Sequence, residues 1–375
     1  MKVVLIARST LNKVYGGDTV QVIKTADYLK QAGIEVDIRL SSERIAYKEY
    51  DLLHFFNITR PADILRHSRV SGKPYVVSTI LCDYSEYDKN YRKGISRLFS
   101  YFSTDTIEYI KTIARCLLGK DHLASPEFIW KGQVKSIMEI LHGAEMLLPN
   151  SLSEYKRLVN RYGTTANHII VPNGVDLSLF QDKHIEKDPN LVLCVARIEG
   201  NKNHINLIKA LNNTRFKLLL VGKPAPNQPG YYADCIKTAA SNIEFIDYLP
   251  LPDLIDRYQH AKVHVLPSWY ETTGLSSLEA ASMGCNIVIT DKGDTRSYFG
   301  DYAFYCNPVS PESIYQAIEK ASLVPYDEGL YHTIANNYTW QKAASQTLKA
   351  YQTVLKTDEQ LSHAFHYEKV SFAAG

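Results

Sequence analysis

The sequence has 375 residues, which is enough for roughly two to three domains with separate cores. Its 45% hydrophobic and 22% charged residues are typical of a globular protein, and a formal net charge of +2 gives no general basic surplus for nucleic acid. Six scattered cysteines without a C-x-x-C pair favour buried free thiols over disulfides or zinc. No apolar run is long enough for a signal peptide or a membrane span, so we expect a cytoplasmic protein.

The first part of the chain has the pattern of a doubly wound sheet. Val3–Ala7 is a strand-like run, and the loop after it carries Gly16 and Gly17 before a helix and a second strand. The two glycines either allow a ligand to approach the backbone or simply form a tight turn. Asp83 follows a later strand, at the position where crevice residues of open α/β sheets lie.

The segment from Tyr84 to about Gly143 is predicted to be helical. Its 92–120 part interleaves apolar residues with the basic residues Arg92, Lys93, Arg97, Lys111, Arg115 and Lys120. Such a segment either forms a solvated face over a core stripe or lies on an anionic membrane surface. The second alternative would place the protein peripherally at the inner face of a membrane.

A second α/β pattern begins after a polar linker. Leu191–Ala196 is strand-like, and Arg197 and Lys202 lie in the loop before the next predicted helix. Two cations at the carboxyl end of a strand can hold a diphosphate, with arginine supplying a planar fork and lysine a point charge. The alternative is an ordinary exposed loop.

The stretch from Val263 to Thr290 predicts a strand, a helix that begins near Gly274, and another strand. Thr272 and Thr273 are candidate caps, and the N-terminus of this helix is expected to face an anion such as phosphate. Two carboxylates, Glu271 and Glu279, suggest acceptors for sugar hydroxyls. They are otherwise explained as a first-turn acid and a solvated helix residue.

Residues 271–284 resemble the E-x7-E signature of retaining glycosyltransferases of the GT-B fold, family 4 type. The matching positions are Glu271, Gly274, Leu275, Leu278, Glu279, Ala280 and Gly284. Arg197 and Lys202 match the family's G-R-L-x-x-x-K-G motif, with Ala196 and Asn203 in place of the glycines. Pro172–Asp176 resembles the P-N-G-V-D string that ends the first domain of this family.

The resemblance implies an α/β fold of GT-B type, in which two doubly wound Rossmann-like domains flank an interdomain cleft. Residues 1–176 would bind the acceptor, and 177–339 would bind a nucleotide-sugar. A helix at about 340–356 would pack back on the first domain, followed by a partly disordered tail at 357–375.

The implied function is retaining transfer of a sugar from a UDP- or GDP-sugar to a hydroxyl of a glycan or lipid-linked acceptor. We expect no cofactor and no metal, since the sequence contains no Asp-x-Asp. A bacterial surface polysaccharide or lipopolysaccharide pathway is the expected setting. The expected catalytic residues are Glu271, Arg197 and Lys202.

The family also implies which residues contact the two substrates. Donor-binding residues would be Arg197, Lys202, Glu271, Thr273, Gly274, Leu275 and Glu279. Acceptor-binding residues would be Gly16, Gly17 and Asp83. The family's N-terminal histidine is missing near Asp83, which leaves two alternatives open: a catalytically decayed nucleotide-sugar-binding subunit or sensor, and a nucleotide-sugar epimerase of the same fold.

Overall fold

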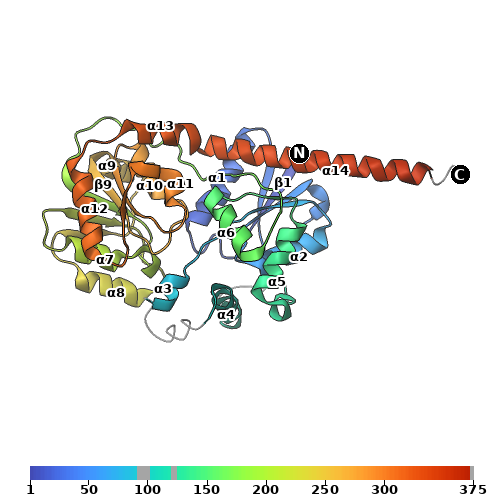
Figure 1. Ribbon diagram of the computed structural model, residues 1–375, viewed down its shortest axis with the longest axis horizontal. Helices are drawn as coiled ribbons and strands as arrows, with labels where there is room; N and C mark the ends of the chain where they lie inside the picture. Colours follow the sequence, from blue (N-terminus) through green and yellow to red (C-terminus); the bar gives the residue numbers. More distant parts are fainter. Residues whose placement is uncertain (91–101, 120–124, 372–375) are drawn as a thin grey trace. The chain divides into compact units, whose positions relative to one another are not determined.

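The structure is a computed structural model that describes residues 1–90, 102–119 and 125–371 (Figure 1). The chain forms two compact units. Unit 1 contains residues 1–81, 105–172 and 340–375, and unit 2 contains residues 82–104 and 173–339. Both are parallel-sheet α/β units, which confirms the predicted fold class.

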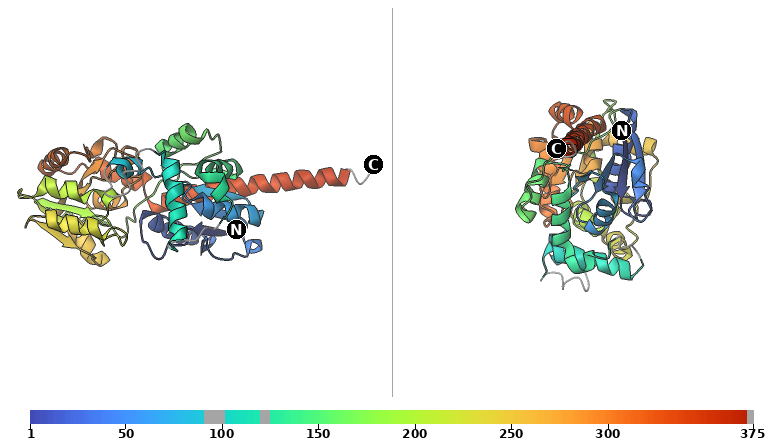
Figure 2. Two further views of the ribbon diagram at one scale, coloured as in Figure 1. Left: turned by 90° about the horizontal axis from the view of Figure 1, so that it is seen from below. Right: turned by 90° about the vertical axis from the view of Figure 1, so that its right-hand side faces the viewer.

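Unit 1 is built on a five-stranded parallel sheet. Its strands are β1 (Lys2–Ala7), β2 (Glu35–Leu40), β3 (Leu52–Phe56), β4 (Tyr75–Ser78) and β5 (Met146–Leu147). Its order is β2-β1-β3-β4-β5, and the central strands are nearly uninterrupted apolar runs because both faces are covered by helices (Figures 1 and 2). The order reverses between β1 and β3, where the crevice of such a sheet lies.

The helices of unit 1 are α1 (Gly17–Gln31), α2 (Pro61–Ser71), α4 (Thr104–Leu117), α5 (Phe128–Gly143), α6 (Leu152–Tyr162) and α14 (Trp340–Ser371). One core joins alternate strand residues such as Phe55 and Val77 to α2, α5 and α6. Helix α14 packs along α1. Its Tyr351 hydroxyl lies 2.6 Å from Nδ1 of His54, whose Nε2 lies 2.8 Å from the Ser78 hydroxyl.

The sheet of unit 2 has six parallel strands. They are β6 (Asp188–Val195), β7 (Lys217–Val221), β8 (Ile243–Ile246), β9 (Ala261–Leu266), β10 (Asn286–Thr290) and β11 (Phe304–Cys306). Alternate residues enter two cores, so that Leu193 and Ile287 lie on one face and Cys194 and Val288 on the other. The order β11-β10-β9-β6-β7-β8 reverses between β6 and β9, which places a ligand crevice at the carboxyl ends of these two strands.

Helices cover both faces of this sheet. The helices of unit 2 are α3 (Ser85–Asn90), α7 (His204–Leu211), α8 (Pro229–Thr238), α9 (Leu251–His260), α10 (Leu275–Ser282), α11 (Thr295–Phe299), α12 (Pro311–Leu323) and α13 (Glu328–Asn337). Short 3-10 turns lie at Tyr47–Glu49, Gly200–Lys202 and Gly300–Tyr302. None of the helices in the described ranges is long and apolar enough to cross a membrane.

The structure differs from the sequence prediction at three places along the chain. Residues 82–104 belong to unit 2 instead of the first domain. The P-N-G-V-D string belongs to unit 2 from its second residue on, because the Asn173 N–H donates to the Tyr298 hydroxyl and the Val175 N–H donates to Tyr338 O. The expected disordered tail is helical as far as Ser371, since α14 continues without a break (Figure 2).

The predicted helical segment of residues 84–143 is divided into α3, α4 and α5. Lys111 and Arg115 lie on α4. The other basic residues on which the membrane alternative rested, Arg92, Lys93, Arg97 and Lys120, lie outside the described residues. Within α5 the backbone is non-helical at Gly132, where φ is 74°.

Candidate functional site

Two loops meet at the switch point of unit 2. The first follows β6 and leads through the turn Gly200–Lys202 into α7, and the second follows β9 and leads into α10. The Asn203 amide donates to the carbonyl of Pro267 at 3.1 Å, and the Trp269 N–H donates to the carbonyl of Asn201 at 2.8 Å. Asn203 has a φ of 60°, a left-handed conformation that asparagine tolerates, which explains how it replaces the family's glycine.

Lys202 and Glu271 form an ion pair across these loops. The Lys202 Nζ donates to Glu271 Oε2 at 2.6 Å, and the Ser268 hydroxyl donates to the same oxygen at 3.1 Å. Burial alone would lower the pKa of Lys202, but the carboxylates, Glu271 first, outweigh it and raise that pKa above its ordinary value. Glu271 Oε1 has no hydrogen-bond partner among the described residues, which leaves it able to accept from a ligand hydroxyl.

Arg197 lies on the same loop and is paired with Glu199. Its Nε and one terminal nitrogen lie 3.0 and 2.7 Å from Glu199 Oε2. Ile198 between them is buried and bridges to Pro224, so the backbone is extended and the side chains of residues 197 and 199 point to the same side. Sequence reasoning missed Glu199, although its two-residue spacing from Arg197 was visible.

Helix α10 begins at Leu275, and its N-terminus is open. The predicted threonine caps are wrong: Gly274 occupies the N-cap position with φ 73°, and no side chain caps the helix. Thr273 Oγ1 instead accepts from the Asn173 amide at 3.0 Å. The N–H groups of Leu275 and Ser276 have no acceptor among the described residues, so they are available to an anion.

Glu279 lies on the second turn of α10 and is half-buried. The buried Tyr258 hydroxyl donates to Glu279 Oε2 at 3.0 Å. Burial, followed by the nearby Glu279 carboxylate, raises the pKa of Tyr258 well above its ordinary value. Tyr258 therefore stays protonated and fixes the orientation of the Glu279 carboxylate.

The loop after β10 holds the backbone of Glu271. The Glu271 N–H donates to Lys292 O at 3.1 Å, and the Asp294 N–H donates to Glu271 O at 3.0 Å. Between them Gly293 has a φ of 103°, and a Cβ there would lie 2.0 Å from the Glu271 carbonyl oxygen. Only glycine allows this close approach.

Helix α3 packs on the same loops of unit 2. Glu86 forms an ion pair with Lys292. The Tyr87 ring lies 6.5 Å from that of Trp269, and its hydroxyl occupies the space that a Cβ of Gly200 would need. This attachment could not be found from local sequence patterns.

The predicted acceptor residues do not all lie in unit 1. Asp83 belongs to unit 2, and its Oδ1 accepts from the Ser85 N–H at 2.9 Å at the start of α3. Gly16 and Gly17 lie at the start of α1 in unit 1. Neither has a positive φ, and the Gly16 N–H donates to Thr19 Oγ1 at 3.3 Å. The backbone at these two residues therefore does not adopt the left-handed conformation for which a tight turn would need glycine.

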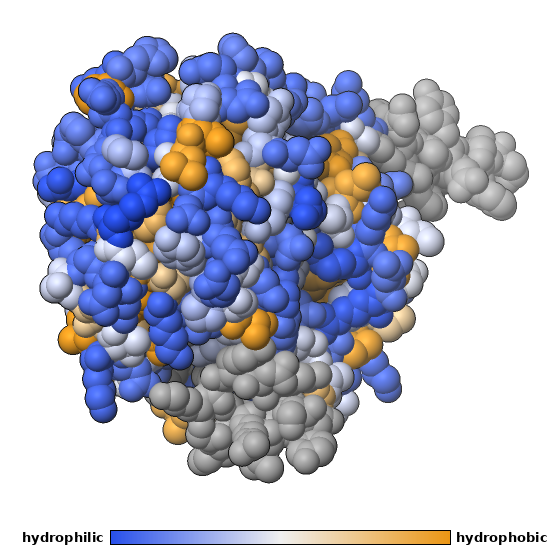
Figure 3. All heavy atoms as spheres, turned by 60° about the vertical axis from the view of Figure 1, so that its left-hand side comes forward, coloured by the Kyte–Doolittle hydropathy of each residue, from blue (hydrophilic) through white to orange (hydrophobic). Residues whose placement is uncertain are grey.

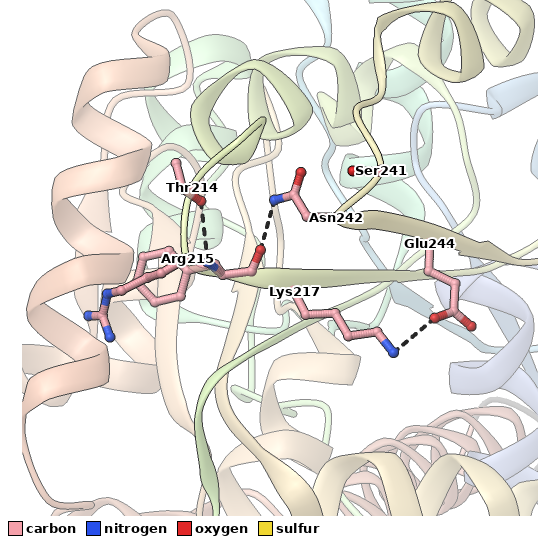
Figure 4. A pocket seen from close by; sticks show the side chains of 7 residues that line it. Thr214, Arg215, Lys217, Ser241, Asn242 and Glu244 are labelled. Atoms are coloured by element: carbon pink, nitrogen blue, oxygen red, sulfur yellow. Dashed lines mark hydrogen bonds and ion pairs between the residues drawn. The ribbon is translucent and has the colours of Figure 1, made fainter.

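A pocket of about 290 Å³ lies elsewhere on unit 2 (Figure 4). It is lined by Thr214, Arg215, Phe216, Lys217, Ser241, Asn242 and Glu244. These residues lie at the amino ends of β7 and β8, whereas ligands of open α/β sheets bind at the carboxyl ends. The pocket is therefore separate from the candidate site.

The fold is that of GT-B glycosyltransferases. Sucrose-phosphate synthase from Thermosynechococcus elongatus superimposes with a TM-score of 0.73 at 14% sequence identity, covering 95% of this chain and 100% of that one. HepE from Anabaena, whose structure is a complex with UDP, gives 0.67 at 14% identity, covering 94% and 100%. At these identities the similarity establishes the fold alone.

Sequence comparison identifies the family of unit 2. Residues 177–340 match the family model for glycosyl transferases group 1. A D-inositol 3-phosphate glycosyltransferase from Streptosporangium roseum is 24% identical over 52% of this chain and 50% of its own length. The mannosylfructose-phosphate synthase of Agrobacterium fabrum is 23% identical over 59% and 56%. The chain thus spans about half the length of the curated relatives it matches.

Proposed function

We propose that the protein is a retaining, metal-independent glycosyltransferase that transfers a sugar from a nucleotide-sugar to an acceptor hydroxyl. The observation that carries this proposal is the arrangement at the switch point of unit 2. There Arg197 and the Lys202–Glu271 pair lie on two loops that are joined by hydrogen bonds, and the second loop ends at the open N-terminus of α10. The group 1 family match over residues 177–340 supports the same function.

In this proposal the donor diphosphate is the leaving group. Arg197, Lys202 and the first N–H groups of α10 stabilise the negative charge that develops on it, in place of a metal ion. Glu271 accepts from a donor-sugar hydroxyl through Oε1 while Lys202 holds Oε2. Glu279, oriented by Tyr258, accepts from the ribose hydroxyls. Transfer then proceeds with retention through an oxocarbenium-like transition state.

The choice of donor and acceptor draws on the relatives. HepE was crystallised with UDP and with UDP-glucose, which supports testing a UDP-sugar before a GDP-sugar. The names of the relatives from Streptosporangium and Agrobacterium support adding phosphorylated sugars and cyclitols to a screen of glycan and lipid-linked acceptors. A role in surface polysaccharide or lipopolysaccharide biosynthesis belongs to the same proposal.

The first experiment is calorimetric titration with UDP and GDP in the presence of EDTA. We expect one nucleotide to bind, and Arg197→Ala to weaken that binding strongly. The control is Lys217→Ala, which removes a cation at the amino end of β7, where it pairs with Glu244 at 3.1 Å. Lys217→Ala should leave the affinity unchanged. Absence of binding by either nucleotide would contradict the proposal.

Product analysis with the identified donor then separates the alternatives. A glycosylated acceptor with retained anomeric configuration is the expected product. An isomerised nucleotide-sugar without transfer would favour the same-fold epimerase. Tight nucleotide binding without turnover on any acceptor would favour the decayed subunit or sensor.

We also propose that unit 1 contacts a membrane that carries the acceptor. Large apolar side chains are exposed near the end of α4 and the start of α5: Leu117, Leu118 and Trp130 are 82%, 67% and 77% exposed. The two helices are joined there by a hydrogen bond from the Tyr109 hydroxyl to Ile129 O at 2.6 Å. On the face shown in Figure 3, by contrast, apolar residues lie in small groups among hydrophilic ones.

Trp130 provides a probe of this contact, because the two other tryptophans, Trp269 and Trp340, are only 4% and 3% exposed. Vesicles containing anionic lipid should shift the emission of the protein to shorter wavelength, and Trp130→Phe should remove the shift. Trp130→Phe retains the two buried tryptophans, so it shows whether they contribute to the shift. This variant should still sediment with the vesicles. An unchanged spectrum together with no sedimentation would refute the contact.

A further inference from the structure

Glu199 belongs to a group of four charged side chains at the switch point. Arg197 is paired with Glu199, and Lys202 is paired with Glu271. Both carboxylates act on Lys202, since each raises its pKa. Within this group of four described side chains, the two positive and two negative charges balance one another. A diphosphate that is to be held by Arg197 must therefore compete with Glu199 for the guanidinium.

The two ion pairs are not equally able to open. Glu271 Oε2 also accepts from the Ser268 hydroxyl, and its backbone is fixed by the loop after β10. Among the described residues, the Glu199 carboxylate accepts a hydrogen bond from Arg197 alone, although its charge also acts on Lys202. The Arg197 side chain is also more exposed than that of Lys202, at 31% against 21%. The Arg197–Glu199 pair is therefore the one that a ligand can open without moving Glu271.

We propose that Glu199 is an internal competitor of the donor diphosphate for Arg197, an inference that rests on the proposed glycosyltransferase function. Without the donor, the Glu199 carboxylate accepts from the guanidinium through both Nε and a terminal nitrogen. When the donor binds, the diphosphate oxygens replace Glu199 as acceptors, and the carboxylate turns outward into solvent. After transfer Glu199 returns to Arg197, which promotes release of the nucleoside diphosphate.

The charge on Glu199 sets the size of the effect. A charge-assisted hydrogen bond is stronger than a neutral one, and a partly exposed ion pair contributes modestly. Glu199→Gln keeps the side chain's size but removes the charge that holds Arg197. We expect it to tighten binding of the nucleoside diphosphate up to about fivefold. Because the competition is ionic, high salt should reduce the difference between the two proteins.

The experiment is calorimetric titration of the wild type, Glu199→Gln, Arg197→Ala and the double variant with UDP and with GDP. The matched control is Glu244→Gln, which removes a carboxylate paired with Lys217 at the far edge of the sheet. Glu199→Gln should bind up to about fivefold more tightly, show a matching fall in the inhibition constant of the product, and keep the melting temperature of the wild type. Glu244→Gln should bind as the wild type does.

The outcomes separate this inference from the function on which it rests. If the wild type binds a nucleotide through Arg197 and Glu199→Gln binds no more tightly, the competition is refuted and the proposed function stands. If Glu199→Gln gives the same gain in the Arg197→Ala background, its effect is general repulsion and the competition is again refuted. If neither the wild type nor Glu199→Gln binds UDP or GDP, both proposals fail.

Discussion

Gly293→Ala tests whether the loop after β10 positions Glu271. A Cβ at residue 293 would lie 2.0 Å from the Glu271 carbonyl oxygen, so the two backbones must separate by about 1.4 Å to reach the 3.4 Å of ordinary contact. The φ of 103° adds strain of about 1 kcal/mol for a non-glycine residue. Overpacking of this kind typically costs about 1–3 kcal/mol. Together these give a loss of roughly 2–4 kcal/mol in the free energy of unfolding.

The assay combines thermal unfolding with nucleotide titration. For a unit of this size, 3 kcal/mol corresponds to a fall of roughly 6–12 °C in melting temperature. A displacement of about 1 Å should also reduce the rate of transfer by roughly 100-fold. The control is Gly163→Ala, where φ is 66° but no atom lies within 4 Å of the added Cβ. This variant therefore adds only the backbone strain, without the steric clash. Equal effects of the two variants, with transfer unchanged in Gly293→Ala, would refute the positioning of Glu271 by this loop.

Three further predictions follow from the same geometry. Asn203→Ala should lower the melting temperature and weaken nucleotide binding, and Asn203→Gly should have a smaller effect on both. Both variants lose the hydrogen bond from the side-chain amide to the Pro267 carbonyl, but only alanine is strained by the left-handed backbone conformation. Tyr258→Phe should raise the Michaelis constant for the donor several-fold by freeing the Glu279 carboxylate, and an unchanged Michaelis constant would contradict the ribose contact. Burial lowers the pKa of His264 to about 3, so the unfolded chain gains protons first and stability falls below pH 6.5, by roughly 2 kcal/mol at pH 5. His264→Leu should remove this loss of stability between pH 6.5 and pH 5, as measured by urea unfolding at each pH. An unchanged dependence of the free energy of unfolding on pH would contradict the prediction.

The parts of the site that sequence could predict are those fixed by local pattern. Arg197 and Lys202 follow an apolar strand, and Glu271 follows another, so their meeting at one sheet edge depends only on strand order. Neither the catalytic roles of these residues nor their contacts with a donor are tested by the fold, and they stay predictions. The threonine caps failed because Gly274 adopts the left-handed conformation that takes the cap position.

Long-range contacts explain what the sequence did not predict. Glu86 reaches Lys292 across 206 residues, and no local periodicity marks such a partner. Asp83 was therefore assigned to the wrong unit, and the boundary after Asp176 overlooked the hydrogen bond of Asn173 to Thr273. Glu199 was overlooked for a different reason: an acidic residue beside an expected phosphate site has no place in the family motif.

The placement of α3 has a consequence for how the protein is made. Among the described residues the chain passes between the two units four times, after Leu81, Thr104, Pro172 and Thr339. On the ribosome, Glu86 emerges 206 residues before Lys292, which at about 5–20 residues per second is a delay of roughly 10–40 s. Unit 1 also lacks α14 until residues 340–371 have been synthesised. Each unit therefore consists of segments that are separated along the chain by segments of the other unit, so neither can complete its native contacts before the intervening segments have been made.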